Sequence, residues 1–68
     1  MTSIVYYKTA RTVRSYVGES PKQMWEAIRK VLDKGYTVTE VNVYDNSVHT
    51  IYTLHFDAQG EPQLRKFR

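Results

Sequence analysis

The sequence contains no cysteine, which excludes disulfide bridges and thiolate metal sites. Only three of its 68 residues are glycine and two are proline. No apolar run approaches the roughly 20 residues that a membrane-spanning helix needs. The first residues, 1–8, lack the basic start and the apolar stretch of a secretory signal. We therefore expect a soluble cytoplasmic protein that has no membrane partner.

Motifs of the common enzyme families are also missing. There is no glycine-rich phosphate loop, no G-x-S-x-G nucleophile motif and no H-E-x-x-H metal motif. The two histidines, His49 and His55, fall on one predicted strand, which places them about 20 Å apart. That separation prevents them from sharing a metal ion or one proton-transfer step, although either histidine alone would suit a minimal ribonuclease. We expect no cofactor, no metal site and no enzymatic activity.

The length fits a single domain over 1–68. A chain of this size buries only about 60% of the surface it exposes when unfolded, which leaves too little buried surface for two separate cores. Hydrophobic residues make up 41% of the chain and charged residues 25%, which is typical of a globular protein and too apolar for disorder.

A helix over 21–34 has the clearest local signals. Ser20 suits the N-cap, Pro21 suits the first helical position, and Gln23 completes an S-x-x-Q capping box. Gly35 is placed to end the helix in the left-handed conformation. Apolar residues recur at helical spacing at Met24, Ile28, Val31 and Leu32.

The rest of the chain is rich in Thr, Val, Ile and Tyr, which favour strands. Strands are predicted over 3–9, 12–18, 36–44, 48–56 and 63–67. Turn-forming residues separate the last three strands. The order β-β-α-β-β-β predicts an α+β fold, in which one helix packs on one face of an antiparallel sheet of four to five strands.

The alternation of side chains along the strands assigns the two faces of the sheet. In 48–56 the apolar residues Val48, Tyr52, Leu54 and Phe56 share the even positions and are expected to meet the helix. In 36–44 the apolar residues change from even positions, Tyr36 and Val38, to odd positions, Val41 and Val43. This change indicates a bulge near Glu40 or a strand that is apolar on both faces. Because one helix covers one face, we expect the second face to expose Tyr, His, Thr and Arg side chains, among them Arg14 and Tyr16. Such a face is suited to docking a macromolecule.

Positive charge is concentrated at the two ends of the chain. The formal net charge is +3, and residues 1–18 carry three basic side chains and no acidic one, residues 61–68 carry a net +2, and residues 19–60 carry a net −2. If the two ends pair in one sheet, they form a single basic edge that attracts phosphates or an acidic protein surface. The alternative is that the charge serves only solubility.

Tyrosine is unusually frequent, with six Tyr among the nine aromatic residues. Tyr and Arg are enriched at interface hot spots, and Tyr stacks on nucleobases. Tyr6 and Tyr7 are adjacent, so one is expected in the core and the other exposed. The alternative is that the tyrosines fill a thin core while their hydroxyls reach water. The residues predicted to contact a partner are Tyr7, Arg11, Arg14, Tyr16, Arg65 and Lys66.

The whole chain resembles small phage-encoded inhibitor proteins, such as some anti-CRISPR proteins and inhibitors of RNA polymerase. Two segments stand at the matching places: the turn 57–62 before a short last strand, and the helix start Ser20-Pro21-Lys22-Gln23-Met24-Trp25 after a strand. The resemblance is one of architecture and carries no functional residue over. Inhibitors that mimic DNA are strongly acidic, whereas this chain is basic, so the resemblance implies binding to a nucleic-acid-binding surface or a protein groove.

These observations lead to four hypotheses. The first is a non-catalytic binding protein that blocks a host nucleic-acid-processing complex by steric occlusion, with a host protein or ribonucleoprotein as its partner. The second is a small basic protein that binds DNA or RNA directly. The third is the minimal ribonuclease, and the fourth is a homodimer in which the uncovered sheet face pairs with itself. The sequence leaves monomer and homodimer both open.

Overall fold

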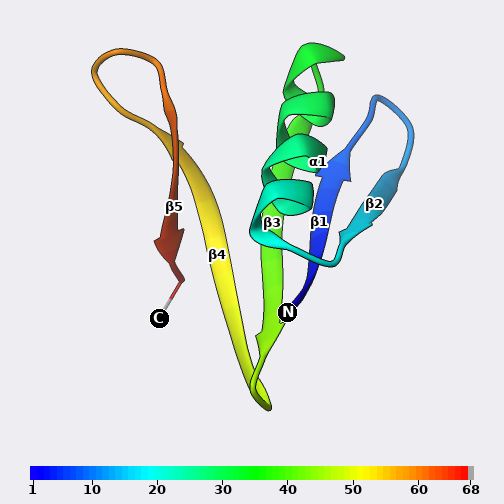
Figure 1. Cartoon of the computed structure of the whole chain (residues 1–68). Helices are drawn as coiled ribbons and strands as arrows, with labels where there is room; N and C mark the ends of the chain where they lie inside the picture. Colours follow the sequence, from blue (N-terminus) through cyan, green and yellow to red (C-terminus); the bar gives the residue numbers. More distant parts are fainter. Residues whose placement is uncertain (68) are drawn as a thin grey trace.

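The computed structural model describes residues 1–67, and over this range five strands form one antiparallel sheet with one helix packed on it (Figure 1). This confirms the predicted α+β fold. The elements are β1 (Thr2–Lys8), β2 (Val13–Gly18), α1 (Pro21–Asp33), β3 (Thr37–Asp45), β4 (Val48–Phe56) and β5 (Pro62–Lys66). Their ends differ by at most one residue from the predicted ranges. Within 1–67, no helix combines the length and the apolar character that crossing a membrane requires.

The two ends of α1 form as the sequence predicts. Ser20 is the N-cap, and its side-chain oxygen accepts a hydrogen bond from the backbone N–H of Gln23 at 3.1 Å. The side chain of Gln23 accepts one in return from the N–H of Glu19 at 2.8 Å. At the other end Gly35 adopts the left-handed conformation with φ +76°, and its N–H bonds the carbonyl of Leu32. These contacts satisfy backbone groups that a helix end otherwise leaves unpaired.

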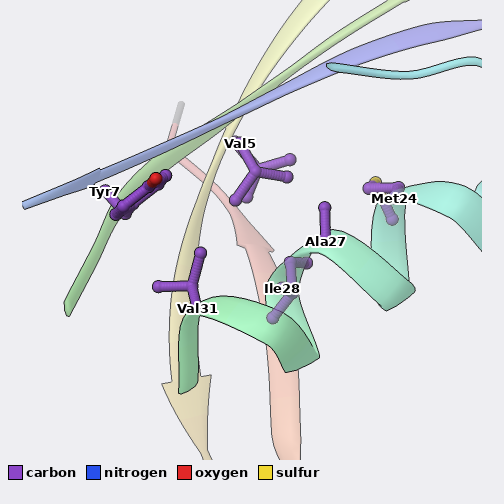
Figure 2. Packing of buried hydrophobic residues seen from close by; sticks show 7 residues of the cluster. Val5, Tyr7, Met24, Ala27, Ile28 and Val31 are labelled. Atoms are coloured by element: carbon purple, nitrogen blue, oxygen red, sulfur yellow. The ribbon is translucent and has the colours of Figure 1, made fainter. Parts of the chain in front are cut away.

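The core lies between α1 and the middle of the sheet. Val5 of β1 and Val41 of β3 are fully buried in one cluster with Ile28 and Val31 of α1, and Figure 2 shows Ala27 and Val31 extending from the helix toward the strand that carries Val5 and Tyr7. Burial of each of these Val and Ile side chains contributes about 1.5–3 kcal/mol. The remaining buried hydrophobic residues are Tyr7, Met24 and Ala27.

The strand order β2-β1-β3-β4-β5 places β1 and β3 under the helix. Among the described elements, α1 packs against β2, β1 and β3 and leaves β4 and β5 uncovered. The even positions of β4 therefore lie on the side of the sheet that was predicted, but the expectation that all of them meet the helix is wrong. Val48 and Phe56 are largely exposed, whereas Tyr52 and Leu54 are half-buried. A helix about 10 Å wide covers two or three strands spaced about 4.8 Å apart.

A β-bulge interrupts the pairing of β1 with β3. Tyr6 pairs with Glu40 and Tyr7 pairs with Val38, so Thr39 is an extra residue in β3. The structure thus confirms the bulge predicted near Glu40. The extra residue reverses the parity of β3, so that Val38 stays on the same side of the sheet as Val41.

The sheet face opposite α1, called the open face below, differs from the prediction at β2. Tyr16 pairs with Val5, whose side chain points into the core, so Tyr16 and Arg14 lie on the helix side. The expectation that the open face exposes these two side chains is therefore wrong. Val13 and Val17, at the alternate positions, point to the open face and are exposed there.

Turn chemistry joins β3 to β4 and β4 to β5. Asn46 and Ser47 both have positive φ, as a tight two-residue hairpin requires. In the next turn, Oδ1 of Asp57 accepts hydrogen bonds from the N–H groups of Gln59 and Glu61. These bonds, led by the one from Glu61, hold the pKa of the Asp57 carboxyl below its ordinary value.

Gly18 allows the first turn of α1 to approach β2 closely. A Cβ atom at this position would lie 2.9 Å from the backbone N of Met24 and 3.0 Å from the backbone C of Gln23. Backbone atoms of a capped helix start cannot move aside without shifting α1 on the sheet.

We predict that Gly18→Ala lowers the free energy of unfolding by about 1–3 kcal/mol, the usual cost of overpacking. Urea denaturation measures this change. Ser15→Ala, at an exposed position of the same strand, is the matched control and should change the stability by less than about 0.5 kcal/mol. Equal stability of the Gly18→Ala variant and the wild type would contradict the close approach.

Candidate functional site

The β1–β2 turn and the C-terminal end of α1 lie at the same end of the molecule (Figure 1). Three tyrosine rings stack beside this turn. Tyr7 is the middle ring. Its centroid lies 5.0 Å from that of Tyr16 and 5.9 Å from that of Tyr36, with interplanar angles of 20° and 13°. The rings come from β1, from β2 and from the residue that follows Gly35, so the stack joins three segments of the chain.

The last turn of α1 and its C-cap residue each add one cation to this stack. Lys30 and Lys34 are four residues apart and therefore lie on the same side of the helix. Their Nζ atoms lie 5.0 Å and 6.0 Å from the centroid of the Tyr16 ring, within the range of a cation–π interaction. Nζ of Lys34 also donates a hydrogen bond to the Tyr16 hydroxyl oxygen at 3.3 Å.

The two hydroxyls of Tyr7 and Tyr16 have opposite pKa shifts. The neighbouring Tyr16 hydroxyl, followed by burial, raises the pKa of Tyr7. The neighbouring Tyr7 hydroxyl, followed by the hydrogen bond from Lys34, lowers the pKa of Tyr16. The Tyr16 hydroxyl oxygen accepts the hydrogen bond from Lys34, and its O–H can donate to a ligand.

The stack forms one wall of a concave site that we call the tyrosine–cation pocket. Its volume is about 460 Å³. The lining residues are Tyr7, Thr9, Ala10, Arg11, Thr12, Arg14, Tyr16, Lys34 and Tyr36. No acidic side chain is among these lining residues of the described chain. Lys8 lines an adjoining hollow of about 370 Å³, which shares Thr9, Ala10, Lys34 and Tyr36 with the pocket.

The chemistry of this pocket favours an anion. Guanidinium groups bind carboxylates and phosphates in a two-pronged geometry, and the ammonium of Lys34 adds a point charge. Neutral donors are available at the Tyr16 hydroxyl. A larger groove of about 620 Å³ lies along α1 beside the β4–β5 turn. It has lining charges of both signs, Lys22 and Arg29 with Glu26, Asp57 and Glu61, and so it does not select for an anion.

The structure brings together four of the six residues predicted to contact a partner. Tyr7, Arg11, Arg14 and Tyr16 all line the tyrosine–cation pocket. Arg11 and Arg14 are exposed, whereas Tyr7 is only 5% exposed and mainly supports the other two rings.

Arg65 and Lys66 lie elsewhere, on β5. The order β2-β1-β3-β4-β5 places β2 and β5 at opposite edges of the sheet. The two ends of the chain do not pair with each other, so the prediction that they form a single basic edge is wrong. The reason is that β1 pairs with β3 on its other side, so two strands, β3 and β4, lie between it and β5.

Sequence reasoning missed three residues of the site: Lys30, Lys34 and Tyr36. A signal for each was present. The two lysines are four apart at the end of the predicted helix. Tyr36 directly follows Gly35, and a left-handed residue there turns the chain back toward the sheet.

The histidines lie away from the pocket, on the open face, and each has a polar partner there. Nε2 of His49 lies 2.6 Å from Oδ1 of Asn42, and the ring stacks on Tyr44 with centroids 4.3 Å apart. Nε2 of His55 lies 2.8 Å from the hydroxyl of Thr53. Within 1–67, no cluster of three or more His, Asp or Glu side chains has the proximity to hold a metal ion.

We predict that Lys34→Met raises the pKa of Tyr16 toward its ordinary value of 10.0, because the substitution removes one hydrogen bond and one positive charge. Carbon NMR of tyrosines labelled at Cζ follows the titration. Lys30→Met is the matched control, because Lys30 faces the ring and makes no hydrogen bond to the hydroxyl. It should raise the pKa of Tyr16 less. Equal shifts in the two variants would show that the Lys34 bond is absent in solution.

Comparison of the chain with protein-family models, with curated proteins and with solved structures gives no match.

Proposed function

We propose that this chain is a non-catalytic binding protein that inhibits a host nucleic-acid-processing complex by steric occlusion, as anti-CRISPR proteins do. The observation that carries the proposal is the tyrosine–cation pocket, in which four cations or donors converge and no acidic lining residue opposes them. A ribonucleoprotein complex presents phosphates on its nucleic acid and carboxylates on acidic patches of its protein subunits. The pocket would bind one of these anionic groups in the host cytoplasm.

The rigidity of the site supports binding. The hydroxyl of Thr9 accepts hydrogen bonds from the N–H groups of Arg11 and Thr12, which fixes the turn that carries the arginine. The stacked rings fix the opposite wall. A preorganised site loses little conformational entropy on association, so a small surface is enough for useful affinity.

Occlusion follows from the shape of the molecule. The folded chain measures 33 × 29 × 22 Å. Anchored by the tyrosine–cation pocket at one end, this body would cover the surface around the anionic contact and keep a nucleic acid strand from it. No chemical step on the partner is required.

We predict that Arg14→Glu weakens binding to the host complex by at least about tenfold, since loss of one charge-assisted contact costs about 1.5–3 kcal/mol. The measurement is affinity capture from host lysate with wild-type and variant baits, quantified by mass spectrometry. Lys66→Glu makes the same change of charge on β5, at the other edge of the sheet. With binding centred on the pocket, it should retain most of the captured complex.

Nuclease treatment of the lysate separates direct protein contact from tethering by nucleic acid. Subunits of one complex that survive nuclease and are lost with Arg14→Glu would support the proposal. Equal capture by the wild type and Arg14→Glu would refute it.

A second candidate is direct binding of single-stranded DNA or RNA. One observation favours it: the ring of Tyr36 ends the stack and is 37% exposed, beside the cations of the pocket. A nucleobase stacked on Tyr36 would place its phosphates near Arg11 and Lys34. In that case a fluorescent oligonucleotide binds with an affinity that falls steeply as salt rises, and both Tyr36→Ala and Arg14→Glu weaken it.

A further inference from the structure

The open face carries a buried polar group that has no partner in the single chain. Asn42 of β3 is only 5% exposed, although no described element covers this side of the sheet. Its Oδ1 accepts a hydrogen bond from Nε2 of His49, whereas its Nδ2 is buried with no hydrogen-bond partner. Buried donors in native proteins are almost always paired. The unpaired Nδ2 of Asn42 therefore points to a hydrogen-bond acceptor from outside the single chain.

The neighbours of Asn42 on the adjacent strands are apolar. The register places Val17, Ile4, Asn42 and Ile51 side by side across β2, β1, β3 and β4. Asn42 is therefore the one amide in a row of branched aliphatic side chains. Val17, at the end of the row, is 62% exposed to solvent.

We propose that the open face is the interface of a homodimer, with a two-fold axis running along this row. In a two-fold interface a residue on the axis meets its own copy. Asn42 is its own complement, because an amide carries both donors and acceptors. Nδ2 of each Asn42 then donates to the second lone pair of Oδ1 in the other copy.

The nearest residues to Asn42 on the same face of β3 can also pair with each other across the two copies. Two residues before it lies Glu40, and two residues after it lies Tyr44; both share its face of the sheet. The rotation exchanges these positions, so Glu40 of one copy meets Tyr44 of the other. The Tyr44 hydroxyl donates to the Glu40 carboxylate, and no pair of like charges meets on the axis.

The dimensions suit a stable dimer. The molecule measures 33 × 29 × 22 Å, and its shortest dimension corresponds to the helix layer stacked on the sheet layer. The open face is therefore bounded by the two longer dimensions, 33 and 29 Å. A standard interface buries about 800 Å² on each partner, which is close to the whole of such a face. In the single chain neighbouring side chains shield Nδ2, so pairing requires rotamer changes, which are common at interfaces.

The first test is the oligomeric state at about 100 µM protein, where a dimer of micromolar Kd is formed. Sedimentation equilibrium should show a dimer for the wild type and a monomer for Val17→Glu, which places two carboxylates against each other on the axis. Val48→Glu is the matched control, because Val48 is 61% exposed on the other side of the sheet and should leave the dimer intact. A monomeric wild type, or equal dissociation by both variants, would overturn the proposal.

The second test concerns the amide and uses the dimer Kd of the wild type as its reference. Asn42→Ala should weaken the dimer about tenfold, since it removes the reciprocal hydrogen bonds. An unchanged dimer Kd would overturn the pairing at the axis. Since the chain has no cysteine, Val17→Cys and Val48→Cys with a short bis-maleimide give an independent check. Only Val17→Cys should form a covalent dimer, and circular dichroism confirms that each variant is folded.

Discussion

A helix is about 10 Å wide, whereas five strands spaced about 4.8 Å apart form a sheet more than twice that width. Within the described residues the chain has one helix for this sheet, and its position is set by where its apolar stripe finds partners. Ile28 and Val31 meet Val5 and Val41, which fixes α1 over β2, β1 and β3. Gly18 allows the close approach that this position needs. The uncovered strands β4 and β5, the open face and the tyrosine–cation pocket at the end of α1 all follow from that placement.

Local features of the fold could be predicted because they depend on neighbouring residues. The capping box at Ser20 and Gln23 and the left-handed Gly35 define the helix, and both are encoded within a few residues. The change of apolar parity in β3 indicated the bulge at Thr39 for the same reason. Pairing between distant strands has no such local code. A signal was nevertheless present: Ile4, Val5 and the two tyrosines make β1 apolar on both faces, which is typical of a strand in the middle of a sheet.

The strand order decides how much of the candidate site could be predicted. With β1 in the middle, the basic residues of the chain's two ends lie at opposite edges. Arg11 and Arg14 keep their tyrosine neighbours, whereas Arg65 and Lys66 have no part in the pocket. The lysines of α1 replace them. Their place beside Tyr16 depends on the rotation of the helix on the sheet, which is a property of packing and cannot be derived from charge along the chain.

The bulge in β3 connects the core to the pocket. On one side of it Val41 and Val43 point toward α1 at odd positions, and on the other side Val38 and Tyr36 do so at even positions. In a regular strand Tyr36 would point to the open face, and the stack would lose its third ring. The extra residue Thr39 thus lets one segment of the chain fill the core through Val41 and line the tyrosine–cation pocket through Tyr36. A β-bulge changes which face of the sheet the following side chains point to. Here the positions that face α1 change from even to odd at the bulge, so the core residues and the pocket residue Tyr36 lie on the same side of the sheet.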